Sequence, residues 1–235
     1  MTPSSTPVFG IVVFPGSTGE QDAAWACECL GIRSRYLWHQ ECDLAGVGAL
    51  ILPGGFSYGD YLRPGAVACT SPIMKEVASY ARSGHPVLGI GNGFQILTEA
   101  HLLEGALLTN NGGRFISREV SLSIEASCIW LDEEKGTTIN LPIAHNKGAF
   151  VCDEKTFESL RENDQIILRY CALGDGGTVI NPNGSLDNIA GICNKQRNVL
   201  GLMPHPELAS DPACGGIDGQ VFFTSALKSL KEVAV

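Results

Sequence analysis

A histidine and a carboxylate two residues apart, His205 and Glu207, have the residue types and spacing that best suit catalysis in this chain. Prolines alternate with them and favour extended backbone, in which residues i and i+2 project to the same side. A carboxylate beside an imidazole orients the ring and stabilises its protonated form, the supporting half of a nucleophile, base and orienter triad. A surface ion pair is the alternative. The apolar segment VLGLM before the pair favours catalysis, because it places the pair at the end of a buried strand.

The segment Pro86 to Ala100, PVLGIGNGFQILTEA, has the pattern of a strand that turns sharply into a helix. Gly89 and Gly93 have the small-x-nucleophile-x-small spacing with which α/β enzymes lift one side chain above the sheet. The residue at the apex is Gly91, which has no side chain to present. Dinucleotide binding is disfavoured, because the glycine spacing is wrong and no acidic residue follows about twenty positions later. A plain connection between strand and helix remains the other alternative.

A loop rich in glycine and proline, PGGFSYGDYLRPG, follows the apolar run Val47 to Leu52. Open α/β sheets place ligand sites at the carboxyl ends of their strands. The adjacent Gly54 and Gly55 could turn backbone N–H groups toward a ligand oxygen, as in an oxyanion hole. A connecting loop explains the composition equally well.

The other histidines carry less weight. His39, His85 and His101 are expected at the edges of helices or strands, with surface or capping roles. His145 follows an expected strand in the second half of the chain, so it could approach the same cleft or contact a partner protein.

Alternation of apolar runs with helical patterns predicts an α/β fold. We expect strands at 8–14, 35–38, 47–52, 86–90, 115–124, 137–144, 166–170, 189–194 and 199–203. We expect helices at 20–30, 72–83, 94–100, 154–163 and 217–233, and a polar turn at 145–148. A parallel sheet brings the carboxyl ends of its strands to one edge, which predicts that His205 lies beside Gly91.

Composition limits the classes of function. The 235 residues, 44% of them hydrophobic and 17% charged, suit a globular protein, and the absence of a linker or repeat favours one domain, 1–235. A net charge of -9 without a basic cluster argues against nucleic acid as the main partner. No apolar run is long enough for a membrane span and the amino terminus does not resemble a signal peptide, so we expect a cytoplasmic location.

The cysteines do not form a recognisable framework. There are nine, an odd number, scattered along the chain without a C-x-x-C pair. This distribution favours reduced and mostly buried thiols over a set of disulfides or a zinc site.

Taken together, the glycine loop, the turn at Gly91 and the H-P-E segment resemble the class I, or triad, glutamine amidotransferases, and more narrowly the glutaminase subunits of phosphoribosylformylglycinamidine synthase. The resemblance extends from about Val8 to the last helix. The motifs that carry it are LPGGFSYGDYLRPGAVA (52–68), GIGNGFQIL (89–97), NGSLDNIAGI (183–192) and NVLGLMPHPE (198–207). It implies a flavodoxin-like, mostly parallel sheet with helices on both faces.

The resemblance also implies roles for individual residues. In the family a cysteine attacks the amide carbon of glutamine, which gives a glutamyl thioester and ammonia. His205 would be the acid and base, and Glu207 would orient it. The backbone N–H groups of Gly55 and Asn92 would form the oxyanion hole. The residues expected to shape the glutamine pocket are Phe56 and Gln95.

The family resemblance implies partners but no cofactor or metal in this chain. Ammonia would pass to a large synthetase subunit that binds ATP and magnesium and converts formylglycinamide ribonucleotide to the amidine. A small third subunit usually completes the complex. This places the chain in purine biosynthesis.

The chain departs from the family at the nucleophile, where Gly91 stands in place of cysteine. An engineered substitution, a sequence error and natural loss of the thiol are three open explanations. Asn146, Lys147 and Leu208 stand where the resemblance implies glycine, glutamate and arginine, and they favour natural divergence. Rescue by Cys69 is disfavoured, because nothing in the sequence places that thiol at the turn.

Two functions follow as hypotheses. The first is an amidotransferase subunit whose glutaminase step is inactive as the sequence stands. The second is a pseudoglutaminase that binds glutamine or the synthetase and acts as a scaffold or regulator. An unrelated α/β hydrolase is a third hypothesis, weakened because neither serine nor cysteine occupies the apex of the turn.

Overall fold

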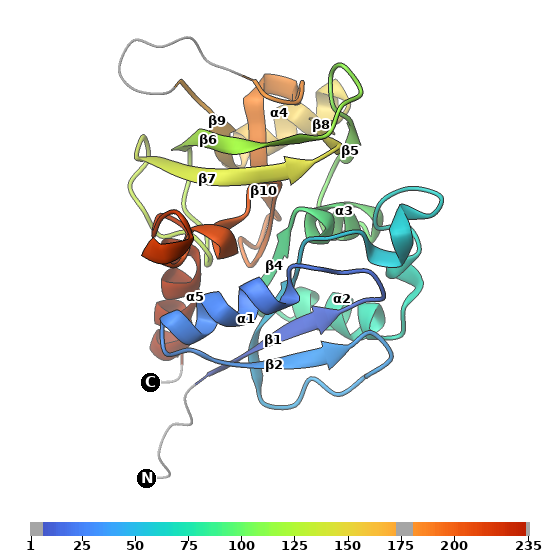
Figure 1. The fold of residues 1–235 in the computed structure, drawn as a ribbon, viewed down its shortest axis with the longest axis vertical. Coiled ribbons are helices and arrows are strands. Elements are labelled where there is room, and N and C mark those ends of the chain that lie inside the picture. The colour runs from blue at the N-terminus through green and yellow to red at the C-terminus, as the bar shows by residue number, and fades with distance from the viewer. Residues whose placement is uncertain (1–6, 173–180, 234–235) are drawn as a thin grey trace.

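The computed structural model describes residues 7–172 and 181–233, which build one nine-stranded sheet and one two-stranded sheet (Figure 1). The strands are β1 (Val8–Val13), β2 (Arg33–Trp38), β3 (Val47–Leu52), β4 (Val87–Ile90), β5 (Ala106–Thr109), β6 (Ile116–Ile124), β7 (Thr138–His145), β8 (Lys147–Val151), β9 (Ile166–Tyr170), β10 (Ile189–Cys193) and β11 (Val199–Leu202). The helices are α1 (Glu20–Cys29), α2 (Ile73–Arg82), α3 (Asn92–Glu99), α4 (Glu154–Glu162) and α5 (Gln220–Val233).

Half of the large sheet is parallel. In space its strands run β2-β1-β3-β4-β11, and each neighbouring pair is parallel. This is the flavodoxin-like order, with β11 in the place of the fifth strand. Strands β4 and β11 are buried along their whole length, as an inner parallel strand must be. The predicted flavodoxin-like fold is confirmed, and β4 and β11 lie side by side.

The sheet then continues through β10, β9, β6 and β7, all of which pair antiparallel. The sequence predicted these strands but not their direction.

Two further strands were not predicted. Strands β5 and β8 form the separate two-stranded sheet. The predicted polar turn at 145–148 was wrong in extent, because only Asn146 interrupts the chain between β7 and β8. Strand β5, ALLT, has only four residues and no alternation of apolar with polar residues, so its sequence does not have the pattern of a half-buried strand, and its side chains are mainly exposed.

Helices cover both faces of the sheet. Helices α1 and α5 lie side by side on one face, where Cys27 and Phe222 pack in the same apolar cluster as Ile11 (Figure 1). Helices α2 and α3 cover the other face, and there Val77 and Leu97 belong to a second cluster. Because successive residues of a strand point to opposite faces, one set of strands supplies both clusters.

The cysteines are free, as expected, but they are not mostly buried. Only Cys27, Cys128 and Cys193 are buried, while the other six are partly or fully exposed. Cys29 illustrates the reason, since it lies two residues from Cys27 on α1 and therefore on a different side of the helix. Within residues 7–172 and 181–233, no helix has the length and apolar character needed to cross a membrane.

Candidate active site

Gly91 connects β4 to α3 through a backbone conformation that side chains disfavour. Its φ and ψ are 52° and -107°, and its N–H donates to the carbonyl oxygen of Leu202 on β11 at 2.8 Å. A Cβ built on Gly91 would lie 3.1 Å from Cε1 and 3.2 Å from Nε2 of His205. A side chain at this position would therefore meet the imidazole, as the predicted arrangement of strands requires.

The two flanking glycines allow β4 and α3 to pack closely. A Cβ on Gly93 would lie 1.9 Å from the carbonyl oxygen of Leu52, and one on Gly89 would lie 2.5 Å from Cδ1 of Leu97. Real Cβ atoms do not approach other heavy atoms so closely, so both positions require glycine.

His205 and Glu207 meet, but not through extended backbone. Nδ1 of His205 donates to Oε1 of Glu207 at 2.7 Å, and the residues are 8% and 4% exposed. Residues Pro206–Ala209 form a short 3-10 helix, so the predicted alternation of side chains is wrong for Glu207. The turn of that helix, rather than an extended segment, brings the carboxylate to the ring.

The environment of His205 favours its protonated form. Burial alone would lower the pKa of this imidazole, but the Glu207 carboxylate, its hydrogen bond and the more distant charge of Asp22 together raise the pKa above its ordinary value. Nε2 of His205 is buried and lacks a hydrogen-bond partner within the described residues. The ring is thus oriented by Glu207 and presents an unused nitrogen on the side of Gly91.

Gly55 and Asn92 both carry backbone N–H groups suited to an oxyanion. Backbone hydrogen bonds from Phe56 to Gly16 (2.9 Å) and from Thr18 to Gly54 (3.2 Å) lie on either side of Gly55. In antiparallel pairing the N–H of a residue between two such bonds points away from the partner segment, so the N–H of Gly55 is not used in this pairing. Asn92 is the first residue of α3, where an N–H has no acceptor within the helix.

The side chains of Asn92 and Gln95 form a buried relay across the site. Oδ1 of Asn92 accepts from the backbone N–H of Ser57 at 3.0 Å, and its Nδ2 donates to Oε1 of Gln95 at 2.8 Å. Nε2 of Gln95 then donates to the carbonyl oxygen of Lys147 at 2.5 Å. This relay connects the glycine loop, α3 and β8, and it fixes the spacing of three walls of the site.

His145 lies at the same site, and its tautomer can be deduced. Nδ2 of Asn110 donates to the carbonyl oxygens of Arg114 and His145, so Oδ1 of Asn110 must face the His145 ring, at 3.0 Å from Nδ1. Nδ1 of His145 therefore carries the proton, which leaves Nε2 as an acceptor. That Nε2 is buried and without a partner in the described residues. Sequence analysis missed Asn110, because a lone asparagine 35 residues away gives no signal.

These residues enclose a cavity of about 170 Å³. Its lining contains Gly55, Phe56, Asp60, Gly91, Asn92, Gln95, Ala144, His145, Asn146, Lys147, Met203 and His205. Each site residue predicted from the sequence lines this cavity, except Glu207, which lies behind His205. His145, which the sequence placed either at the cleft or against a partner, lines the cavity together with Lys147. Asp60 is a lining residue that sequence analysis did not single out.

Of the three histidines assigned to edges, His85 and His101 are exposed, whereas His39 is buried. His39 is only 7% exposed, and its Nδ1 lies 2.9 Å from the hydroxyl of Tyr58 in the glycine loop. The predicted surface role was therefore wrong for His39, whose ring contacts the glycine loop through Tyr58. Cys69 does not line the cavity, and its Sγ donates to the carbonyl oxygen of Ile96 at 3.5 Å.

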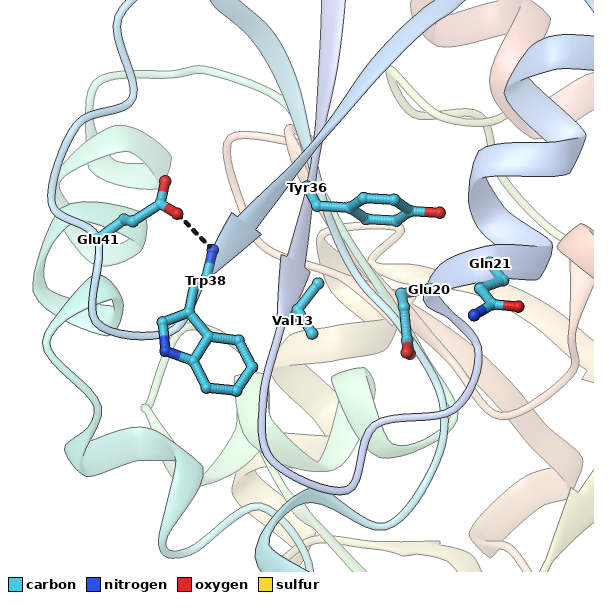
Figure 2. Close-up of a pocket in the computed structure, with 6 residues that line it drawn as sticks. All are labelled: Val13, Glu20, Gln21, Tyr36, Trp38 and Glu41. Carbon is cyan, nitrogen blue, oxygen red and sulfur yellow. Dashed lines mark hydrogen bonds between the residues drawn. The ribbon is translucent and has the colours of Figure 1, made fainter.

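A second hollow, of about 320 Å³, lies where β1 and β2 end (Figure 2). It is lined by Val13, Glu20, Gln21, Tyr36, Trp38 and Glu41. Figure 2 shows two aromatic rings and separate carboxylates there, with Glu41 accepting from the backbone N–H of Trp38. It shares no residue with the cavity at Gly91 and contains no imidazole.

We expect His145 to stay neutral down to about pH 4. Burial and the charge of His205 lower its pKa to about 4. Between about pH 6.5 and pH 4 the unfolded chain then binds more protons, so the free energy of unfolding falls as the pH drops, by about 3 kcal/mol in total from this group. His205, with a raised pKa, contributes with the opposite sign, so the slope must be compared between the parent and His145→Gln. NMR titration of the ring protons checks the prediction, and titration of His145 near pH 6.5 would contradict it.

Comparison with known proteins matches the geometry to a family. The model of the CobB/CobQ-like glutamine amidotransferase domain matches residues 6–215. The phosphoribosylformylglycinamidine synthase subunit PurQ of Trichormus variabilis is 49% identical over 229 residues, which cover 96% of this chain and 99% of that protein. Its counterpart in Chlorobaculum tepidum is 51% identical over 225 residues, 94% of this chain and 96% of the relative.

Comparison with solved structures supports the same family. A chain in the structure of PurLQS from Thermotoga maritima superposes with a TM-score of 0.84 at 43% identity, over 96% of this chain and 99% of that one. A GMP synthase protein from Thermoplasma acidophilum shares the fold alone, with a TM-score of 0.63 at 15% identity over 97% of this chain and 96% of that one.

Proposed function

This chain belongs to the family of PurQ subunits of phosphoribosylformylglycinamidine synthase, which are glutamine amidotransferases, and we propose that it binds glutamine for that synthase but lacks the thiol step. Residues 1–235 then act as one amidotransferase domain. The proposal places the chain in the cytoplasm, with the rest of a complex for purine biosynthesis.

One observation carries the proposal: Gly91 stands where the attacking side chain belongs. A Cβ at Gly91 would lie 3.2 Å from the free Nε2 of His205. A side chain at this position would therefore contact the imidazole as a nucleophile contacts its base. The backbone angles of 52° and -107° are those of a strained turn, retained here by a residue that has no side chain. Without sulfur at this position no thioester with glutamine can form.

The remaining groups still suit recognition of a carboxamide. Gly55 and Asn92 line the cavity, and their backbone N–H groups would donate to the carbonyl oxygen of the glutamine amide. Nε2 of His205 faces the place where the amide would react. The exposed Phe56 and the buried Gln95 also line the cavity and would complete the pocket.

The partners follow from the family. The Thermotoga relative was solved as part of PurLQS, which supports a large synthetase partner for this chain. In this proposal the synthetase holds ATP and magnesium and acts on formylglycinamide ribonucleotide, and a third, small subunit completes the complex. A chain that binds glutamine and the synthetase without releasing ammonia acts as a scaffold or as a sensor of glutamine.

We expect saturable binding of glutamine to the isolated chain, measured by calorimetry, with no ammonia released. Gln95→Leu should weaken binding by roughly tenfold or more, because it breaks a relay of buried hydrogen bonds. Gln21→Leu is the matched control, since Gln21 is exposed and lines the other hollow. The affinity of this variant for glutamine should equal that of the parent. Absence of saturable binding to the parent chain would refute the proposal.

A further inference from the structure

The second hollow, where β1 and β2 end, takes no part in the proposed function. It shares no lining residue with the cavity at Gly91. Its volume of about 320 Å³ lies at the lower end of the range for small-molecule pockets, roughly 300 to 1,000 Å³. Open α/β sheets hold their ligands beyond the carboxyl ends of the strands, which is where this hollow lies. Size and position therefore suit a small ligand of its own.

Two aromatic rings line the hollow. Tyr36 and Trp38 alternate with the buried Leu37 along β2, so both rings stand on the same face of the sheet as Val13 (Figure 2). They are 52% and 43% exposed. Exposed apolar side chains that gather on one face, rather than singly, mark binding sites. The faces of aromatic rings attract cations, so the rings suit a positively charged ligand.

The polar lining of the hollow is acidic. Glu20 begins α1 and Glu41 follows β2, and among the described residues no lysine, arginine or histidine lines the hollow. In the part of the chain that the structure describes, none of the ion pairs found includes either carboxylate. Oε1 of Glu41 accepts from the backbone N–H of Trp38 at 3.2 Å. Oε2 of Glu20, in contrast, is buried and lacks a partner in that same part of the chain. Buried polar atoms are normally hydrogen-bonded, so this oxygen indicates a missing donor.

The charges around the hollow disfavour an anion. The start of a helix ordinarily attracts anions, but α1 begins with two acids, Glu20 and Asp22. Arg35 of β2 lies on the other face of the strand, where it donates to the backbone carbonyl oxygens of Asp43 and Ala45. A cation in the hollow would therefore meet carboxylates and aromatic faces, without a positive charge among the lining residues to oppose it.

The unsatisfied oxygen of Glu20 narrows the kind of cation. A quaternary ammonium group has no N–H to donate, so it would leave that oxygen unpaired. A guanidinium group is planar, carries several N–H donors along its edge and stacks on aromatic rings. It can donate to Glu20 from its edge while its face lies against a ring of β2, which satisfies both features of the hollow at once.

We propose that the second hollow binds a free monoalkylguanidinium cation, held by the carboxylate of Glu20 and by the rings of Tyr36 and Trp38. The guanidinium N–H groups donate to Oε2 of Glu20, and the alkyl group contacts Val13. This ligand site goes beyond the proposed function and does not depend on it, since no residue of the glutamine cavity takes part.

Methylguanidinium tests the site by NMR titration of the isotope-labelled full chain. The indole N–H signal of Trp38, assigned by its loss in Trp38→Leu, should shift and saturate in the millimolar range. The signals of Trp25, outside the hollow, and of the buried Trp130 should stay in place. Glu20→Gln should weaken binding roughly 10- to 100-fold, the worth of a hydrogen bond to a charged group. Tyr36→Leu should weaken it roughly 2- to 30-fold, the range of a cation–π contact.

Glu28→Gln is the matched control, because Glu28 is an exposed carboxylate of α1 that does not line the hollow. The affinity of this variant for methylguanidinium should equal that of the parent. Methylurea has nearly the same shape without the charge, and tetramethylammonium has the charge without an N–H, so each should bind about tenfold or more weakly. Equal binding of methylguanidinium and methylurea, or equal binding by the parent and by Glu20→Gln, would refute the site. Thermal unfolding of each variant checks that a loss of affinity does not come from a loss of structure.

An arginine side chain of a partner protein carries the same cationic group as a free alkylguanidinium. The blocked peptide acetyl-glycyl-arginyl-glycinamide presents that side chain without charged ends. If the ligand is a free small cation, this peptide should bind no more tightly than methylguanidinium. Binding of the peptide more than about tenfold tighter would make the hollow a docking point for a partner's arginine and would overturn the proposal.

Discussion

The Gly91→Cys variant, mixed with the large synthetase subunit, ATP and formylglycinamide ribonucleotide, should release ammonia from glutamine on the order of a million-fold faster than the parent chain. Removal of the nucleophile from a triad costs about that factor, because only binding and oxyanion stabilisation remain. The structure retains the other parts, since His205 is oriented by Glu207 at 2.7 Å and presents a free Nε2 to position 91.

The substitution has a cost in stability. A cysteine would have to adopt φ and ψ of 52° and -107°, which costs about 1–3 kcal/mol in a side-chain-bearing residue. Its Cβ would also lie 3.1 Å from Cε1 of His205, so the imidazole must shift by a few tenths of an ångström. We therefore expect an active variant that unfolds at a lower temperature than the parent.

Two variants separate the effect of the thiol on activity from the effect of the backbone strain on stability. Gly91→Ala carries the same strained backbone without sulfur, so it should lose stability and gain no activity. His205→Asn combined with Gly91→Cys should lose the gained activity. If the folded Gly91→Cys chain binds the synthetase and glutamine but releases no ammonia, the divergence extends beyond Gly91 and the scaffold becomes the better account.

Gly93→Ala should destabilise the chain more than any of these changes, by at least about 3 kcal/mol, the upper range for overpacking a core. The added Cβ would lie 1.9 Å from the carbonyl oxygen of Leu52. The backbone of α3 fixes the position of the Cβ, and the oxygen belongs to the backbone of β3, so no side-chain rotation relieves the overlap and the helix must move off the sheet. Denaturant unfolding of parent and variant measures the loss.

Gly216→Ala is the matched control. A Cβ on Gly216 would contact nothing within 4 Å, and the φ of Gly216 lies outside the left-handed range. The free energy of unfolding of the Gly216→Ala variant should therefore stay within about 0.5 kcal/mol of the parent. Equal stability of the two variants would contradict the close packing of β3 and α3. Because α3 begins at Asn92, the same packing positions this proposed oxyanion donor, and a folded Gly93→Ala chain should also bind glutamine more weakly.

The parallel half of the fold was predictable because its signals are local. Strands such as β3 and β4 are continuous apolar runs, and the glycines at 89, 91 and 93 mark a tight turn without reference to any other segment. The prediction that the turn at Gly91 and the H-P-E segment share one edge of the sheet is also confirmed, since β4 pairs with β11 in parallel. Neighbouring parallel strands have their carboxyl ends at the same edge of the sheet, so the apolar pattern of β4 and β11 is enough to predict where the two segments that follow them lie.

By itself, the sequence determined the parallel strands, the glycine turn and the absence of a thiol at its apex. Folding in three dimensions was needed to reveal the antiparallel half of the sheet, the turn that brings Glu207 to His205, the tautomer of His145 and the joint lining of one cavity by Asp60 and Lys147. The physical reason is the range of the forces involved. Apolar periodicity and glycine conformation act within a few residues, whereas hydrogen bonds and charges act between atoms that are neighbours only after the chain has folded.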